Sequence, residues 1–229
     1  MGKAGKKYRA AIERIDPGRL YSLDEALNLL KEIVYAGFNE TVEFIISLGI
    51  DPRKSDQIVR GTVSLPHGTG KKVRILAFCK PEDVDEALAA GAEYAGAADL
   101  VEKIKGGWVD FDVAVAEKSM MRDISRLGKI LGPRGLMPSP KAGTVTDDIP
   151  GAINELKAGK IEFKSNKYGD IQVAIGKISF SPEQLKENIL CLYQEIVRLR
   201  PAVVKGRYIN KATICASMSP SLTLDIASL

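Results

Sequence analysis

The sequence predicts a two-domain α/β protein: a two-layer α+β domain built from both ends of the chain, and an inserted α/β domain with an open parallel sheet. Near both ends, strands with alternating apolar and polar residues adjoin amphipathic helices, as in a sheet covered on one face. Between them, short apolar runs are followed by helices, which is the unit of a parallel sheet. Turn residues at 66–70 and 158–160 mark the crossings. We therefore expect one domain from 1–67 with 159–229, and a second from 68–158.

The N-terminal part predicts a helix and two strands behind a basic arm that contains Lys3, Lys6, Lys7 and Arg9. Ser22-Leu23-Asp24-Glu25 reads as a capping box, and the apolar spacing after it predicts a helix that ends near Gly37. Alternation over residues 41–50 predicts a half-buried strand, and residues 58–65 indicate its continuation in the same layer.

The middle part repeats short strands and helices. We expect strands at 73–78 and 111–116 and helices near 81–90, 98–105, 120–127 and 149–157.

In the C-terminal part, apolar and polar residues alternate again. Residues 161–163 and 171–175 predict a hairpin joined through residues 166–170. Ser181-Pro182-Glu183-Gln184 caps a long helix, and residues 208–217 predict a final strand.

The distribution of charge is more informative than its total. The chain has 229 residues, is 45% hydrophobic and carries a net charge of only +4, so it can bury a substantial core but is weakly basic. Residues 1–67 hold 10 basic and 9 acidic side chains, residues 160–229 hold 10 and 6, and residues 68–159 hold 13 and 14. If the ends fold together, their domain carries the positive field and the middle domain is nearly neutral.

The chain lacks the usual residues of an enzyme. His67 is the only histidine and lies in a predicted connector, where a positional role is favoured over catalysis. Gly68-Thr69-Gly70 is half of a dinucleotide fingerprint, but Val73 occupies the place of the third glycine, and no P-loop occurs. Cys79, Cys191 and Cys215 are widely spaced in apolar runs, which predicts buried reduced thiols without a metal or disulfide. Trp108, Met120 and Met121 are expected in the core.

No stretch has the length and apolarity of a membrane span, which favours a cytoplasmic protein, although a removed transit peptide stays open. A positively charged terminal domain indicates a nucleic-acid-binding function. Two other function classes compete with it: a nucleotide-dependent enzyme and a protein-interaction scaffold. The first is opposed by the missing motifs, and the second predicts negligible, salt-insensitive affinity for RNA.

Residues 127–145 (LGKILGPRGLMPSPKAGTV) combine cations with turn residues. The charged side chains Arg126, Lys129, Arg134 and Lys141 suit a phosphate-rich polymer, and the alternative is a rigid turn with solvated charges.

Together with residues 51–70 (DPRKSDQIVRGTVSLPHGTG) and 157–163 (KAGKIEF), this block resembles the family of ribosomal large-subunit protein one, bacterial type, over nearly the whole chain. The resemblance implies that the terminal domain binds ribosomal RNA of the mobile stalk and that the inserted domain has a Rossmann-like three-layer fold without a nucleotide. It implies no enzyme activity, no cofactor and no metal, and a monomer when free. It places the protein in the cytoplasm in the ribosome, with an organellar ribosome left open.

The resemblance also assigns sites. It implies RNA contacts at Phe38, Thr41, Arg53, Lys54, Ser55, Lys164, Asn166, Lys167, Gly169, Lys211, Ser217, Met218, Ser219, Pro220 and Ser221. Arg126, Lys129, Arg134 and Lys141 would form a secondary surface for RNA or exit-site tRNA, and Pro66, His67, Gly68, Gly70 and Gly159 a hinge. By the same resemblance, binding to the leader of its own messenger RNA is a hypothesis.

Three positions depart from the family pattern. Ser217-Met218-Ser219 replaces Thr-Met-Gly, Gly37 replaces a lysine, and Ser165-Asn166 replaces Asn-Asp.

Overall fold

The computed structural model describes residues 5–229, so Lys3 of the basic arm lies outside the described residues. The chain forms two compact units. Unit 1 contains the residues up to Gly70 together with Ile161–Leu229, and unit 2 contains Lys71–Lys160. The mixed α/β class is confirmed, because an antiparallel sheet and a parallel sheet are both present.

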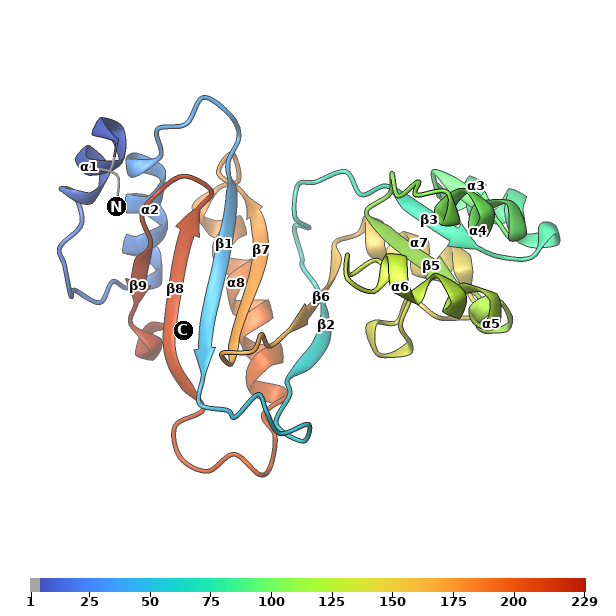
Figure 1. The fold of residues 1–229 in the computed structure, drawn as a ribbon. Helices are drawn as coiled ribbons and strands as arrows, with labels where there is room; N and C mark the ends of the chain where they lie inside the picture. The colour runs from blue at the N-terminus through green and yellow to red at the C-terminus, as the bar shows by residue number, and fades with distance from the viewer. Residues whose placement is uncertain (1–4) are drawn as a thin grey trace. The chain divides into compact units, whose positions relative to one another are not determined.

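Unit 1 is built on a four-stranded antiparallel sheet in the order β7-β1-β8-β9. Two long helices, α2 and α8, pack on one face of it (Figure 1). The elements are α1 (Lys6–Ile12), α2 (Leu23–Ile33), β1 (Thr41–Leu48), β2 (Arg60–Ser64), β6 (Lys160–Lys164), β7 (Asp170–Lys177), α8 (Pro182–Arg198), β8 (Ile209–Ala216) and β9 (Leu222–Leu224).

The predicted capping boxes start both long helices. Glu25 N donates to Ser22 Oγ at 3.4 Å, and Ser22 N donates to Glu25 Oε2 at 3.3 Å. Ser181 and Gln184 make the same reciprocal pair at the start of α8, with distances of 3.2 and 2.9 Å. Each box satisfies two of the backbone donors that a helix start leaves free. Both helices therefore begin at the residues that the sequence predicts.

Two pairing predictions for unit 1 are wrong. β2 does not continue β1 in the same layer, and β6 does not form a hairpin with β7. Instead β2 and β6 pair with each other in a separate two-stranded sheet. Gly61 in β2 allows this ribbon to approach α8, because a Cβ there would clash with Leu199 Cδ1 and lie 3.0 Å from Phe163 Cζ.

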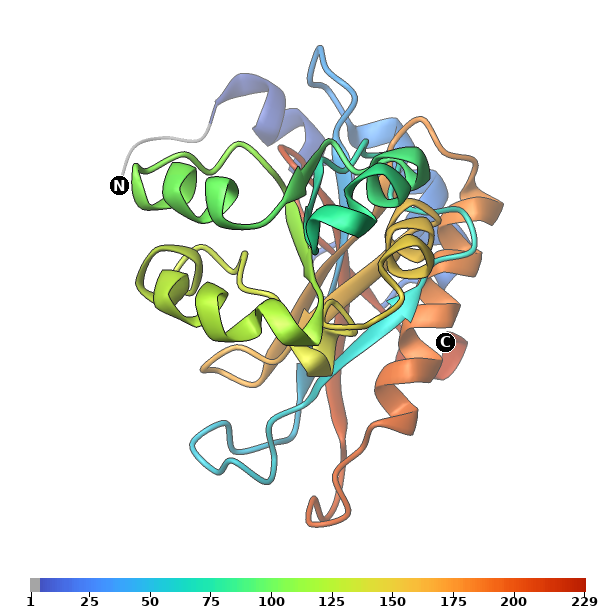
Figure 2. The same cartoon turned by 90° about the vertical axis from the view of Figure 1, so that its right-hand side faces the viewer.

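Unit 2 has a three-stranded parallel sheet in the order β4-β3-β5. Figure 2 shows α4, α5 and α6 on one side of this sheet and α3 and α7 on the other, which gives three layers. The main elements are β3 (Ile75–Phe78), α3 (Val84–Ala90), β4 (Tyr94–Gly96), α4 (Ala98–Lys105), β5 (Val113–Ala116), α5 (Met121–Ile124), α6 (Gly128–Leu131) and α7 (Ile149–Lys157). Short 3-10 turns flank them at Pro81–Asp83, Lys118–Met120, Ser125–Leu127 and Pro140–Ala142.

Side chains from alternate positions of β3 fill two separate cores. Leu76 and Phe78 point to the α4 side, whereas Ile75 and Ala77 point to the α3 side. Trp108 packs edge-on against Tyr94 with ring centroids 4.8 Å apart, which agrees with its expected place in the core. The sheet is therefore buried on both faces, as parallel sheets usually are.

Two further sequence expectations need correction. The helix expected at 120–127 is a series of short helical turns rather than one helix. Cys79 is buried, but Cys191 and Cys215 are only partly buried. Their burial is still sufficient to raise the pKa of both thiols above its ordinary value.

Among residues 5–229, no cluster of three or more histidine, cysteine or acidic side chains could hold a metal ion. Over the same residues, every helix is too short or too polar to cross a bilayer.

Candidate nucleic-acid interface

The sheet of unit 1 has one helix-covered face and one face of partly exposed side chains, here called the open face. On β1 the exposed set is Thr41, Glu43, Ile45 and Ser47, while the residues between them are buried. Register places a β7 residue beside each of them and a β8 residue beside Glu43, Ile45 and Ser47, in rows such as Asp170–Ser47–Lys211 and Gln172–Ile45–Thr213. The two-residue period predicted for residues 41–50 thus produces a surface with polar groups at regular intervals.

The centre of the open face is not cationic. Glu43 lies there and contacts the side-chain amide of Gln172, and Asp170 lies opposite Ser47, two open-face rows further along β1. The predicted RNA-contacting cations of this domain therefore lie away from the middle of the sheet, at the end where β1 finishes and β8 begins.

The first end, where β1 begins and β8 ends, brings Phe38 and Thr41 to Ser217–Ser221. Ser217 N donates to Thr41 O at 3.1 Å, and Thr41 N donates to Ser217 Oγ at 3.2 Å. Phe38 is 57% exposed and Met218 is 51% exposed, so two large apolar side chains face solvent at this end. An exposed aromatic ring and an exposed thioether offer surfaces on which an unstacked base can pack.

A buried carboxylate holds this end in shape. Glu40 is fully buried, and its Oε2 accepts from Met218 N at 2.7 Å while its Oε1 accepts from Ala36 N at 3.3 Å. Tyr35 Oη donates to Met218 O at 2.8 Å. Both backbone polar groups of Met218 are therefore fixed, and its side chain is presented outward. Sequence reasoning missed Glu40, because one acid before a strand forms no pattern.

Ser219, at the family's glycine position, uses its side chain within the loop. Its Oγ accepts from Ala216 N at 2.9 Å. The hydroxyl therefore caps the end of β8, in the manner of a serine turn.

The second end of the sheet carries most of the predicted cations. It contains the Arg53-Lys54-Ser55 corner after β1, the turn from Lys164 to Gly169 before β7, and Lys211 at the start of β8. Asn166 Oδ1 accepts from Tyr168 N at 2.8 Å and from Asp170 N at 3.0 Å, which closes the turn.

Gly169 ties this turn to β1. Its φ is +87°, a left-handed conformation that favours glycine, and its carbonyl accepts from Leu48 N at 3.0 Å. A Cβ at this position would also lie 3.3 Å from Leu48 O. The turn and the end of β1 are thus held together.

The cations of the second end are available to a ligand. Over the described residues, Arg53, Lys54, Lys164 and Lys211 are exposed and none of them forms an ion pair with a carboxylate. Lys167 Nζ lies 5.0 Å from the ring centroid of Tyr168, which is 71% exposed. Tyr168 is a candidate stacking side chain that sequence reasoning missed, although an exposed tyrosine in a basic turn was a visible signal.

The predicted RNA residues therefore lie in two clusters, one at each end of the open face. β1 links them, and its seven steps of about 3.3 Å separate the ends by roughly 23 Å. A ligand that contacts both clusters must extend along the strand.

The predicted secondary surface lies in unit 2. Arg126, Lys129, Arg134 and Lys141 are all exposed, and none has a carboxylate partner among the described residues. They lie between Ser125 and Ala142, on short helical turns and the loops that join them.

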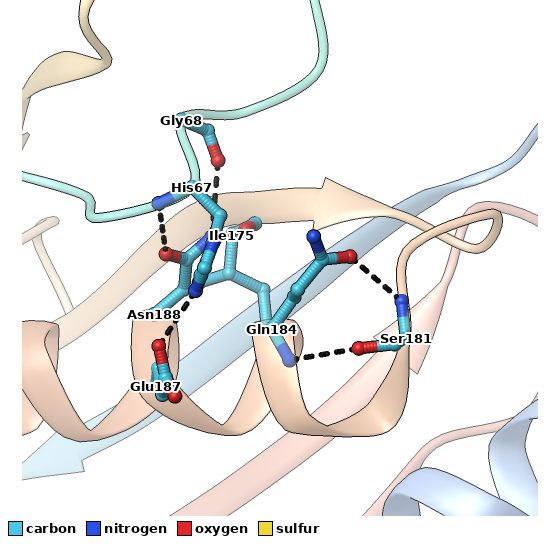
Figure 3. A network of polar contacts seen from close by, with 7 residues as sticks. All are labelled: His67, Gly68, Ile175, Ser181, Gln184, Glu187 and Asn188. Atoms are coloured by element: carbon cyan, nitrogen blue, oxygen red, sulfur yellow. Dashed lines mark hydrogen bonds and ion pairs between the residues drawn. The ribbon is translucent and has the colours of Figure 1, made fainter.

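The predicted hinge residues of the outgoing connection are anchored to unit 1 (Figure 3). His67 N donates to Asn188 Oδ1 at 3.1 Å, and Asn188 Nδ2 donates to Gly68 O at 3.0 Å and to Ile175 O at 2.7 Å. His67 Nε2 also contacts Glu187 Oε2 at 2.6 Å. Asn188 is fully buried, so the backbone at 67–68 is fixed on α8.

The chain is anchored again as unit 2 begins. Asp112 accepts from Lys71 Nζ at 2.7 Å, from Arg74 N at 3.1 Å and from Arg74 Nε at 3.2 Å. The Lys71 ammonium, with smaller help from Arg74, lowers the pKa of Asp112 to about 2. Of the other predicted hinge residues, Pro66 precedes the anchored segment, Gly70 ends unit 1 with φ +68°, and Gly159 follows α7 with φ +107°.

Comparison with known proteins identifies similar chains. The sequence model described as the Ribosomal protein L1p/L10e family matches residues 30–220. A protein of Kosmotoga olearia named large ribosomal subunit protein uL1 is 51% identical over 98% of this chain and 97% of its own length. A protein of Chlamydia trachomatis with the same name is 52% identical over 100% of this chain and 99% of its own length. A third, from Bifidobacterium animalis, is 50% identical over the full length of both chains.

Proposed function

Because this chain belongs to the Ribosomal protein L1p/L10e family, we propose that it is a constituent of the large ribosomal subunit whose unit 1 binds the RNA of the mobile stalk. The resemblance inferred from the sequence motifs is confirmed by this family membership. The family is made of structural ribosomal proteins, so the chain is a ribosomal protein and not an enzyme. The alternative of a nucleotide-dependent enzyme is thereby excluded.

The observation that carries the proposal is the pair of clusters at the two ends of the open face. One cluster offers exposed Phe38 and Met218 beside backbone groups that are already paired. The other offers cations without carboxylate partners, together with Tyr168. Folded RNA presents phosphates at regular intervals and unstacked bases at loops and bulges, and it extends far enough to contact both ends.

We further propose that unit 2 contacts exit-site tRNA through Arg126, Lys129, Arg134 and Lys141 and helps that tRNA move and leave. Four exposed cations that form no ion pair among the described residues are suited to phosphates, although they carry no base specificity. Movement of unit 2 would occur at the two connections between the units, at the predicted hinge residues Pro66, His67, Gly68, Gly70 and Gly159. Of these, Gly70 and Gly159 have φ values of +68° and +107°. The hydrogen bonds of His67 and Gly68 to Asn188 hold the start of the first connection on unit 1.

The proposal is tested by binding of the full chain to an isolated stalk RNA over a range of KCl concentrations. Met218→Ala is expected to reduce affinity about tenfold, because it removes an apolar contact from the binding end. Arg134→Ala, on unit 2, is expected to leave this affinity unchanged. Equal losses in the two variants would contradict the assignment of the site to unit 1, and affinity that does not fall with salt would favour a protein-interaction scaffold.

Repression of its own messenger RNA is a second proposal, which requires the leader transcript to present the same fold as the stalk. A gel-shift with the leader transcript should show binding that Met218→Ala weakens in parallel with stalk binding. Normal stalk binding without leader binding would remove this idea.

A further inference from the structure

The N-terminal helix α1 forms one wall of a hollow next to the first end of the open face. The hollow has a volume of about 680 Å³. Lys6, Lys7 and Tyr8 line it from α1, Tyr35 lines it from the segment after α2, and Ser217–Ser219 lines it from the loop after β8. The hollow is wide open to solvent, so it would cover only one side of a ligand.

The lining has the chemistry of a nucleotide site. Within the described part of the chain, it contains two ammonium groups, two phenol rings and the thioether of Met218, but no carboxylate. Lys6 and Lys7 are exposed, and over the described residues neither pairs with an acid. Ammonium groups neutralise phosphates, while aromatic rings and methionine offer faces to an unstacked base.

The far wall of the hollow is fixed before any ligand arrives. Tyr35 Oη holds Met218 O at 2.8 Å, and buried Glu40 holds Met218 N at 2.7 Å. A wall that is already ordered loses little conformational entropy when a ligand binds.

We propose that this hollow takes one unpaired nucleotide of the RNA that unit 1 binds, with its phosphate on Lys6 and Lys7 and its base against Tyr8 and Met218. The inference rests on the proposed function, because the same RNA must already lie on the first end of the open face. It extends that site in two ways. The basic segment before α2 becomes part of the binding surface, and α1 becomes an element that is specific for RNA with an unpaired nucleotide at this point.

Position favours RNA over a phosphopeptide or an anionic membrane surface. The loop at 217–219 lines the hollow and also pairs with Thr41 at the edge of the open face, so the hollow continues the proposed RNA surface.

The test measures binding of full-length variants to stalk RNA as a function of KCl concentration. Lys6→Gln should weaken binding several-fold and lower the slope of log affinity against log salt by about 0.7–0.9, the value for one lost phosphate contact. Arg9→Gln is the matched control, because it removes the same charge from the same helix at an exposed position that does not line the hollow. It should bind like the wild type. Circular dichroism of both variants checks that α1 is retained.

A double-mutant cycle makes the test sharper. If Lys6 and Met218 hold one nucleotide, Lys6→Gln combined with Met218→Ala should weaken binding by less than the product of the two single losses. Arg9→Gln combined with Met218→Ala should give the simple product.

The outcomes separate the two proposals. If Met218→Ala weakens binding and Lys6→Gln does not, the hollow is not a site but the proposed function stands. Equal losses in Lys6→Gln and Arg9→Gln would also overturn the site, because they indicate a general effect of charge. If the wild-type protein does not bind stalk RNA, the proposed function fails and this inference fails with it.

Discussion

Unit 1 and unit 2 bury their sheets differently, and the difference decides how each can bind a polymer. In unit 1, β1 buries every second residue and leaves the others on an open face. In unit 2, all four residues of β3 are buried, because helices cover both faces of the sheet. A sheet that is covered on both sides can offer a ligand only its edges and loops.

The comparison also explains where the chemistry of each unit lies. The predicted contacts of unit 1 lie on or beside strand ends that buried polar side chains hold in place, as Glu40 holds the loop at Met218. The cations of unit 2 lie on short helical turns and loops outside its sheet. Unit 1 is therefore suited to recognise one RNA shape, and unit 2 to contact phosphates without strict geometry.

The largest expected effect comes from removing a large buried side chain from the core of either unit. Phe44 in unit 1 and Phe78 in unit 2 are 1% and 0% exposed, so alanine at either position should lower the free energy of unfolding of its own unit by about 3–5 kcal/mol. Trp108 is the only tryptophan and lies in unit 2. In guanidinium titrations, Phe78→Ala should shift the fluorescence transition, whereas Phe44→Ala should shift only part of the circular dichroism signal.

The two phenylalanine variants control for each other. If the fluorescence and dichroism transitions coincide in both variants, the two units unfold together. The difference between their sheets would then not make their stabilities independent.

Local patterns were sufficient to predict much of this structure. The capping boxes at Ser22 and Ser181 are present, and the helix expected at 149–157 has those bounds. Such features depend on residues three or four positions apart, which a single sequence displays directly. The alternation of β1 predicted an open face for the same reason.

Partners that are distant in sequence could not be predicted. β6 and β7 resemble a hairpin because a turn joins them, yet each pairs with a strand more than 90 residues away. The three-residue strands β4 and β9 are too short to show a period. The bond from Tyr35 to Met218 spans 183 residues, so the shape of the first end and the hollow beside α1 were not visible in the sequence.

The second prediction concerns the hydrogen bonds of Asn188, which hold residues 67–68 at the end of unit 1. Asn188→Ala leaves His67 N, Gly68 O and Ile175 O without their partner, and should lower the stability of unit 1 by about 2–4 kcal/mol. Glu187→Gln is the matched control on the same helix. Its side chain is 60% exposed and its contact with His67 should contribute less than about 1 kcal/mol. A loss in Asn188→Ala that is no larger than that of Glu187→Gln, measured by dichroism, would show that the segment is not anchored.

The smallest expected effect concerns Asp112, which holds Lys71 and Arg74 at the start of unit 2. It is tested through the pH dependence of the stability of unit 2. The pKa of Asp112 is lowered from 3.8 to about 2, so the folded state binds this proton less readily than the unfolded state does. Its stabilisation, about 2 kcal/mol from the size of the shift, is fully present above about pH 4 and is lost as the pH falls towards 2. Asp112→Asn should therefore destabilise unit 2 at pH 6 but differ little from the wild type at pH 2, with Trp108 fluorescence as the measurement.

Asp110→Asn is the control. The Asp110 side chain is 62% exposed, so this variant should lose less free energy of unfolding at pH 6, because solvent screens the contact of Asp110 with Arg74. If the difference in free energy of unfolding between Asp112→Asn and the wild type stays constant from pH 6 to pH 2, Asp112 stabilises unit 2 by packing rather than by charge. In that case only unit 1 fixes its end of the connection with a polar network.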